Sequence, residues 1–299
     1  MIRKNRSSLF FVTILLAGLV VSCSEREDVT QYAPTEVYPD DNTLDGIASK
    51  KAMIVIAHDD DMCAMTGTIS MLNKKGWDIR VISIRKDEDR NEAHRKACSR
   101  LLDSVMFFNF DPAKLRIEPE DGQNLYDAIP KDQFEQVFNR PLVELEIQQR
   151  INQFQPSVIF TLDSEMGGYG HPEHVFISQL VVDLAKADSI QPEYIYQSVY
   201  TNHMEKTIMA RHSKRMKSWG FPGDGWERAK AAYNTPEGMP EPTVQINITS
   251  EARAKMNYLK SYNKRERKTM GFFIPAFEFY SAEEYFNIFD REFYRVIKL

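Results

Sequence analysis

The sequence is poor in cysteine, with only Cys23, Cys63 and Cys98 in 299 residues. Two cysteines beyond the N-terminal region do not make a disulfide framework. We interpret Cys63 and Cys98 as buried thiols, with a single disulfide between them as the alternative. Basic residues are also in the minority: without residues 1–22, which carry three basic and no acidic side chains, the formal net charge of −5 becomes −8. Such an acidic chain argues against a nucleic acid as the partner.

Only one long hydrophobic run stands out, at residues 9–21, and it follows a basic stretch. It is short for a membrane span and fits the apolar region of a secretory signal peptide, which would occupy residues 1–22. The segment Val-Val-Ser-Cys at 20–23 resembles a bacterial lipobox, in which Cys23 is acylated. An ordinary signal peptide with an incidental cysteine is the alternative. We therefore expect an exported lipoprotein, anchored through Cys23 to the outer membrane or cell surface of a Gram-negative bacterium.

Strand and helix patterns alternate along most of the remaining chain. Residues 23–49 are polar and are expected to form a flexible tether, and 50–299 one domain with a core at 50–200 and a C-terminal elaboration at 201–299. Hydrophobic runs predict strands at 52–57, 79–84, 105–108 and 157–162, and helices at 65–75, 90–103, 174–185 and before Pro156. This alternation predicts an α/β, Rossmann-like fold, with a mainly parallel sheet and helices on both faces.

The C-terminal hundred residues are less regular. A strand is expected at 244–248 with a helix after it, and 218–226 has the composition of a loop. Phe and Tyr are dense in 272–294, which favours core packing for aromatic side chains in this part of the chain. The alternative is that Trp219, Phe221 or Trp226 stacks on a sugar ring at the mouth of a site.

Two groups of imidazole and carboxylate side chains each follow an expected buried strand. His58 and Asp59–Asp61 follow the first strand, and His171 and His174 follow the strand at 157–162. The carboxyl ends of parallel strands form the ligand-binding crevice of open α/β sheets. Two His and one Asp suit a catalytic zinc, which would leave one Asp as a general base and one His to steady an oxyanion. Each group alone is also explained as a helix cap or a surface turn.

The two groups resemble the signatures of the PIG-L / LmbE-like family of zinc-dependent N-deacetylases. The family's first signature, Ala-His-Pro-Asp-Asp-Glu, corresponds to Ala-His-Asp-Asp-Asp-Met at 57–62, and its second, His-Pro-Asp-His, to His-Pro-Glu-His at 171–174. The resemblance runs from about residue 50 to 187 and continues weakly through 246–260. Asp59 replaces the family's Pro, so a less rigid turn is expected. Met62 replaces its Glu, so a partner of the metal ligands is expected to be missing.

The resemblance implies a role for each matching residue. Asp60 would be the base that activates the attacking water, and His171 would help to stabilise the tetrahedral intermediate. Arg90 and Tyr169 would be candidate substrate contacts. The ligands of Zn²⁺, or of another divalent transition metal, would be His58, Asp61 and His174.

These roles imply a metal-dependent hydrolase that removes an N-acetyl group from an N-acetylglucosamine-type sugar conjugate. The expected partners are an N-acetylated amino sugar or glycan as substrate and a membrane through the lipid on Cys23. Two other functions stay open: hydrolysis of another N-acyl amide on the same scaffold, and non-catalytic glycan binding by a lipoprotein. The second of these is expected to lack a ligand or the base, yet all of those positions are kept in this chain.

Overall fold

The computed structural model describes residues 26–117 and 128–299. Within these residues a seven-stranded sheet has the order β3-β2-β1-β4-β5-β7-β6. Strands β1 to β5 are parallel, and β7 pairs antiparallel with both β5 and β6. The expected α/β fold with a mainly parallel sheet is therefore confirmed. The strands are β1 Lys51–Val55, β2 Asp78–Ser83, β3 Ser104–Phe107, β4 Val158–Leu162, β5 Tyr194–Val199, β6 Val244–Asn247 and β7 Arg291–Lys298.

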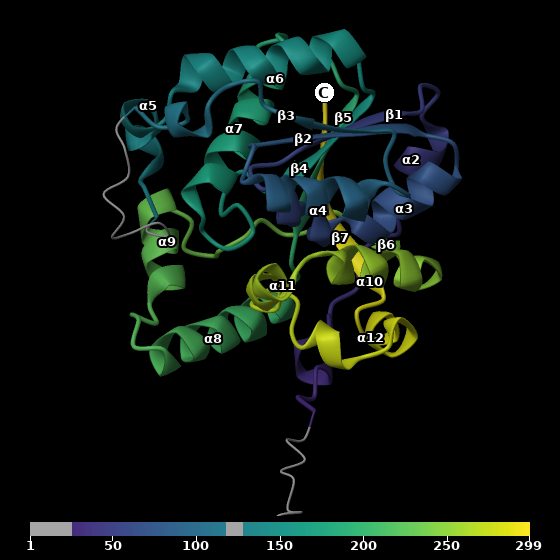
Figure 1. The fold of residues 1–299 in the computed structure, drawn as a ribbon, viewed down its shortest axis with the longest axis vertical. Helices are drawn as coiled ribbons and strands as arrows, with labels where there is room; N and C mark the ends of the chain where they lie inside the picture. The colour runs from purple at the N-terminus through teal and green to yellow at the C-terminus, as the bar shows by residue number, and fades with distance from the viewer. Residues whose placement is uncertain (1–25, 118–127) are drawn as a thin grey trace, which may run out of the picture.

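Helices cover both faces of this sheet (Figure 1). Successive side chains of β1 enter different cores, because strand residues alternate between faces: Ile54 belongs to one hydrophobic cluster and Val55 to the other. Helices α3, α4 and α10 pack on the Ile54 side, and α6 and α7 on the Val55 side. These five helices are α3 Thr66–Lys74, α4 Glu88–Cys98, α6 Arg140–Phe154, α7 Pro172–Lys186 and α10 Ala252–Ser261.

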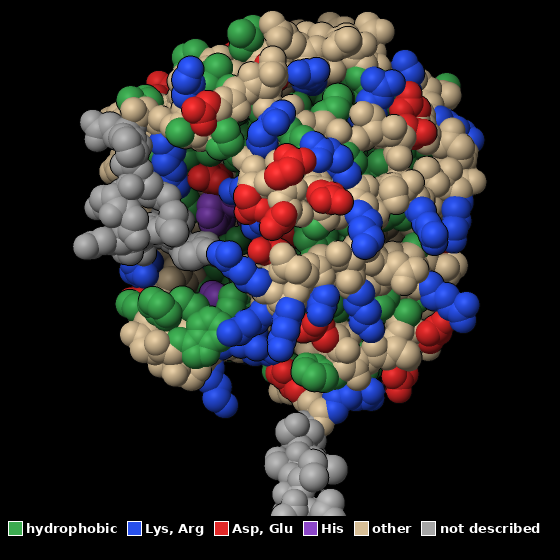
Figure 2. All heavy atoms as spheres, in the orientation of Figure 1, with side chains coloured by type: hydrophobic (Ala, Val, Ile, Leu, Met, Phe, Trp, Pro, Cys, Tyr) green, Lys and Arg blue, Asp and Glu red, His purple; other side chains and the backbone are tan. Residues whose placement is uncertain are grey.

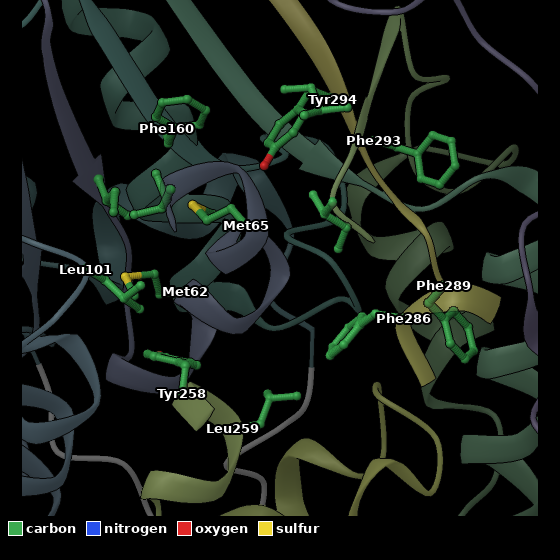
Figure 3. Close-up of a cluster of buried hydrophobic side chains, with 14 of the residues drawn as sticks. Met62, Met65, Leu101, Phe160, Tyr258, Leu259, Phe286, Phe289, Phe293 and Tyr294 are labelled. Carbon is green, nitrogen blue, oxygen red and sulfur yellow. The ribbon is translucent and has the colours of Figure 1, made fainter. Parts of the chain in front are cut away.

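The C-terminal hundred residues complete the sheet instead of standing apart from it. The expected strand at 244–248 is β6, but β7 at the C-terminal end was not foreseen. Aromatic side chains of this region fill the core, as Figure 3 shows for Phe286, Phe293 and Tyr294, so the core-packing interpretation is confirmed for them. The remaining α-helices in the described residues are α2 Thr43–Gly46, α5 Phe134–Val137, α8 Asn202–Ser218, α9 Gly225–Tyr233, α11 Lys264–Met270 and α12 Ala282–Ile288.

Residues 26–49 are packed on the domain, so the prediction of a flexible tether across 23–49 is wrong for this part. Val29 is fully buried and Leu44 is 5% exposed, both within the main hydrophobic cluster. The backbone N–H of Asp41 donates to the carbonyl of Gln245 in β6 at 3.0 Å, and the hydroxyl of Tyr196 donates to the Asp41 carboxylate at 2.8 Å. Scattered apolar residues in a polar segment find partners far along the chain, which local composition does not reveal.

Two further expectations concern the cysteines and the membrane. Cys63 and Cys98 are both free thiols; Cys98 is buried, whereas Cys63 is only partly so. The proposed signal peptide and the acylated Cys23 lie outside the described residues. Within residues 26–117 and 128–299, no helix combines the length and the apolar character that crossing a bilayer requires.

Candidate metal centre

The first group of site residues is held at the end of β1 by a tight turn. His58 keeps an extended backbone and precedes a 3₁₀ helix, η3 (Asp59–Ala64). The carboxylate of Asp61 accepts a hydrogen bond from the backbone N–H of His58 at 2.8 Å, which forms a capping box. The helical turn starts at once, so Asp60 and Asp61 are not forced to opposite sides as they would be in an extended strand.

The second group lies beyond β4, which is the direct neighbour of β1 in the sheet. His171 is the N-cap of α7, and its Nδ1 accepts from the backbone N–H of Glu173 at 3.2 Å. His174 then lies in the first turn of α7. Gly167 in the preceding loop has a φ of +58°, and a Cβ there would lie 2.6 Å from the Cβ of His174. Only glycine fits this close approach, so the loop is shaped around His174.

Atoms of His58, Asp61 and His174 converge with a spacing that suits one metal ion. His58 Nδ1 lies 2.8 Å from His174 Nε2, which is 3.2 Å from Asp61 Oδ1. Asp61 Oδ2 is 3.9 Å from His58 Nδ1. Ligand atoms about 2.0–2.1 Å from a tetrahedral zinc are separated by roughly 3.3 Å. The separations here, 2.8–3.9 Å to one or the other oxygen of Asp61, lie around that value. Ligand atoms of His58, His171 and His174, and of His58, Asp60 and Asp61, also gather within 4.8 Å of one another.

The outer nitrogens of the two converging imidazoles have their own hydrogen-bond partners. His58 Nε2 is 2.7 Å from the carboxylate of Glu173, and His174 Nδ1 is 2.9 Å from the carbonyl oxygen of Gly167. Both partners accept, so these nitrogens carry the protons and the opposite nitrogens present lone pairs to the centre. Glu173 therefore supplies the carboxylate partner expected to be missing at Met62, which is instead buried in the core. The sequence pattern assigns no role to Glu173 and so misses this contact.

Burial sets the protonation of the centre. It lowers the pKa of His174 to about 4 and also lowers the pKa of His58, so both imidazoles are neutral near pH 7. Burial would raise the pKa of Glu173, but the hydrogen bond from His58, together with the electrostatic influence of His58, His171 and Lys86, holds that pKa well below the usual range. Burial raises the pKa of Asp61 to about 7, a cost that a neighbouring divalent cation would offset. Neutral imidazoles beside a carboxylate are the donor set that zinc prefers.

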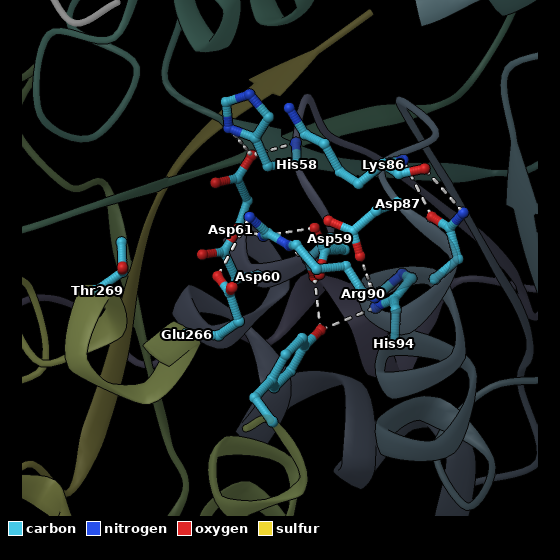
Figure 4. A network of polar contacts seen from close by, with 12 residues as sticks. His58, Asp59, Asp60, Asp61, Lys86, Asp87, Arg90, His94, Glu266 and Thr269 are labelled. Atoms are coloured by element: carbon cyan, nitrogen blue, oxygen red, sulfur yellow. Dashed lines mark hydrogen bonds and ion pairs between the residues drawn. The ribbon is translucent and has the colours of Figure 1, made fainter. Parts of the chain in front are cut away.

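Arg90 holds the other two carboxylates of the run (Figure 4). Its Nη2 lies 2.6 Å from Asp59 Oδ1 and 2.8 Å from Asp60 Oδ1, while Nη1 lies 3.3 Å from Glu266 Oε2. Burial opposes the charge on Asp60, but Arg90 and the nearby His58 keep the pKa of Asp60 below its usual value. Burial and the charge of Asp60 raise the pKa of Asp59 to about 7. Arg90, expected as a substrate contact, thus lies against the candidate base.

The C-terminal region braces the turn where the family's proline is absent. The backbone carbonyl of Asp59 accepts hydrogen bonds from the hydroxyl of Tyr258 at 2.8 Å and of Tyr262 at 3.1 Å. Both tyrosines are buried, and Glu266 from α11 completes the contacts of Arg90. These three residues lie outside both family signatures and outside the aromatic-rich range 272–294, so neither pattern pointed to them.

A pocket opens beside the centre. Asp60, Asp61 and His174 line one end, and most of the remaining wall is apolar. Tyr169 belongs to this wall. Its ring stacks on that of Phe273, with 4.0 Å between the ring centres, and packs edge-to-face with the ring of His174, with 5.0 Å between the ring centres. Histidine side chains are visible within a hollow in Figure 2. The pocket lining does not include Trp219, Phe221 or Trp226, so the hypothesis that one of them stacks on a sugar gains no support here. The other lining residues are Cys63, Ala64, Leu162, Gly168, Ser198, Val199, Tyr200, Met239, Thr269 and Met270.

Comparisons with known proteins give one family match and several similar solved structures. Residues 53–185 match the family model described as PIG-L: GlcNAc-PI de-N-acetylase. No curated protein matches the chain by sequence. Three solved structures are similar at low identity. The first is N,N'-diacetylchitobiose deacetylase from Pyrococcus horikoshii, with 14% identity, 84% of this chain and 85% of that chain covered, and a TM-score of 0.47.

The second is the 4-carboxy-2-hydroxymuconate hydratase GalB from Pseudomonas putida KT2440, with 16% identity, 84% and 97% coverage of this chain and that chain, and a TM-score of 0.47. The third is the zinc-inhibited form of teicoplanin deacetylase Orf2, with 12% identity, 83% and 98% coverage, and a TM-score of 0.46.

The matched range begins in β1, ahead of His58, and ends in α7, beyond His174. It therefore contains both groups of residues that converge on the centre. The resemblance carried by the two short signatures is confirmed over this range, and residues 53–185 match the PIG-L family model.

Proposed function

We propose that the protein is a metal-dependent amide hydrolase that removes an N-acetyl group from an N-acetylglucosamine-type sugar conjugate. The observation that carries the proposal is the convergence of His58 Nδ1, His174 Nε2 and the Asp61 carboxylate, whose Oδ1 lies 3.2 Å from His174 and whose Oδ2 lies 3.9 Å from His58, with Asp60 beside them. The description of the matching family, a de-N-acetylase of a GlcNAc conjugate, supports the reaction type and the sugar.

His58, Asp61 and His174 would hold the ion, with zinc as the first choice from this donor set. When bound, such an ion lowers the pKa of water and polarises a carbonyl group. Asp60 is kept ionised by Arg90 and so can accept the proton of the attacking water.

His171 is buried, and its ring centre lies 4.7 Å from that of His174, where it can stabilise charge that develops on the substrate oxygen. Arg90 acts in this proposal as the partner of Asp60, and Tyr169 as a wall of the substrate pocket. The proton that Asp60 accepts can pass to the leaving nitrogen, and cleavage of the C–N bond then releases acetate and a free amine.

The apolar pocket favours a second candidate, a hydrolase of N-acyl groups larger than acetyl. The buried side chains of Leu162, Val199, Met239 and Met270 line it, and they offer no hydrogen bonds to a sugar. An acyl chain or another apolar group of the substrate would bury well against them. Non-catalytic glycan binding stays the weakest alternative, since the ligand and base positions are all present.

One experiment separates these candidates. The purified chain, loaded with Zn²⁺, is assayed for free amine on glucosamine derivatives that differ only in the length of the N-acyl chain, and on N-acetylated glycan fragments. Deacetylation that is lost on chelation supports the first candidate, and preference for longer acyl chains supports the second. Failure to release amine from any member, at full metal occupancy, contradicts both.

Localisation forms a separate part of the proposal. We propose that the chain is an exported lipoprotein anchored to a Gram-negative membrane through Cys23, because of the lipobox-like segment at 20–23. Cys23→Ala is expected to move the mature protein from the membrane fraction to the soluble one, or to leave an uncleaved precursor. Unchanged partitioning, with no lipid on residue 23 by mass spectrometry, contradicts it.

A further inference from the structure

Positive charge is concentrated on two helices of an otherwise acidic chain. Helix α8 carries five Lys and Arg residues and one acidic residue, Glu205, which is buried. Helix α11 carries four Lys and Arg residues and one acidic residue, Glu266, which is turned inward to Arg90. The formal net charge of the whole chain is −5. The two helices therefore carry a local excess of basic residues in a chain that is acidic overall.

Exposed aromatic side chains accompany this charge. Trp219, directly after α8, is 44% exposed, and Phe221 is 56% exposed. Lys268 Nζ lies 4.7 Å from the centre of the Trp219 ring, and the guanidinium of Arg215 lies 4.9 Å from that of Phe272. Figure 2 shows hydrophobic side chains bordered by Lys and Arg at the lower left. We call α8, α11 and the segments 219–223 and 271–273 the basic–aromatic face.

The described chain begins on this same face (Figure 1). The guanidinium of Arg211 donates to both carboxylate oxygens of Glu27 at 2.7 Å and to the carbonyl of Gly271 at 2.8 Å. Arg26 lies 3.6 Å over the ring of Tyr280 and donates to the carbonyl of Phe279, whose side chain is 71% exposed. The start of the packed chain is therefore bonded to α8 and to the segment that follows α11.

The short distance in sequence between Cys23 and Arg26 restricts where a lipid on Cys23 can reach. Three extended residues span about 10 Å at most. Because Arg26 is already bonded to the body, a lipid on Cys23 would hold the surface around Arg26 at the bilayer. The proposed lipid on Cys23 and the charge of α8 and α11 are independent arguments, and both point to the same face.

We propose that the basic–aromatic face docks on an anionic phospholipid surface. Lys and Arg side chains are attracted to anionic headgroups, and Trp side chains favour the level of the headgroups, where one part of the ring is apolar and another polar. The interaction does not depend on the hydrolase activity. Its consequence for the site is geometric: Phe273, which lines the pocket, directly follows Phe272 of this face. Docking would therefore bring the pocket close to the lipid surface.

The test uses the chain from residue 23 with Cys23→Ser, which has no lipid but keeps every described residue. Binding to vesicles of phosphatidylcholine alone is compared with binding to phosphatidylcholine mixed with phosphatidylglycerol, by flotation, at low and high salt. Binding is expected only to the anionic vesicles and is expected to weaken with salt. Lys214→Glu with Lys217→Glu should weaken it by about tenfold or more, and Trp219→Ala with Phe221→Ala should weaken it clearly.

The matched control variants lie on α6 and α7, the helices that cover the opposite face of the sheet. Leu145→Ala removes a side chain that is 52% exposed on α6, and Lys186→Glu reverses an exposed charge at the end of α7. Both should bind as the parent does. Trp219→Phe should keep binding but lose the blue shift of tryptophan emission that vesicles cause, because the reporting indole is gone.

Three outcomes overturn the proposal. The first is equal binding to neutral and anionic vesicles, and the second is an equal loss of binding in the control variants. The third is binding of a soluble sulfated glycan without any binding of vesicles, which would assign the face to an anionic glycan instead.

Discussion

Replacement of Asp60 by Asn tests the catalytic assignment within a run of three carboxylates. Asp60 Oδ1 lies 2.8 Å from Arg90 Nη2, and Asp60 is the carboxylate of the run whose pKa is lowered. Asp60→Asn keeps the size and leaves an oxygen for Arg90, but it removes the basic oxygen. Loss of a general base typically costs about 10²–10⁴ in turnover. We therefore expect turnover to fall by that factor while the bound metal remains, since Asp60 is not a proposed ligand.

Asp59→Asn is the matched control, one residue away in the same run. It keeps the backbone carbonyl that Tyr258 and Tyr262 bind, and its amide oxygen can still accept from Arg90. Asp59 stands where the family has proline, so no carboxylate chemistry is expected of it. We expect turnover to fall by less than about tenfold, because only a buried positioning contact is weakened.

The assay measures free amine under saturating substrate, with metal content determined on the same samples by elemental analysis. The assignment of Asp60 as the base would be refuted if Asp60→Asn kept nearly the activity of the parent while Asp59→Asn was inactive. Loss of metal in Asp60→Asn would instead make Asp60 a ligand, in line with its position within 4.8 Å of ligand atoms of His58 and Asp61.

Three other predictions follow from single contacts. Glu173→Gln removes the carboxylate that lies 2.7 Å from His58 Nε2, and should weaken zinc affinity by about 10–100-fold in a competition titration. Unchanged affinity would contradict a role of Glu173 in holding His58. Arg90→Ala leaves Asp59 buried and unpaired, and should lower the free energy of unfolding by about 3–5 kcal/mol in urea; an effect below about 1 kcal/mol would show that water replaces the pair. Leu44→Ala should lower the free energy of unfolding by about 2–5 kcal/mol, because Leu44 is buried in the core. No change in that free energy would indicate a flexible segment.

The core of the fold could be predicted from local patterns. Runs such as 52–57 and 157–162 are apolar over the length of a strand, and parallel strands bring their carboxyl ends to one edge. That is why His58 and His174, 116 residues apart, could be expected in one site from two short signatures. The pattern alone could not assign the three adjacent aspartates, because their directions depend on where the helical turn begins.

The remaining parts depend on contacts that carry no local periodicity. Leu44 is an isolated apolar residue in a polar segment, yet it is buried by elements more distant in sequence. Glu173 has no role in the sequence pattern, and only the fold shows its carboxylate against His58. Tyr258 and Tyr262 reach Asp59 across about two hundred residues, so no window of sequence contains both partners.

Elemental analysis of the purified chain tests the central claim most directly. The account predicts about one zinc-type divalent ion per chain, and loss of most of that metal in Asp61→Ala and in His174→Ala, because each removes one of three ligands. Leu145→Ala, on the far helix α6, should keep the full amount. A parent chain that binds no divalent ion, or full occupancy in both ligand variants, would contradict the account.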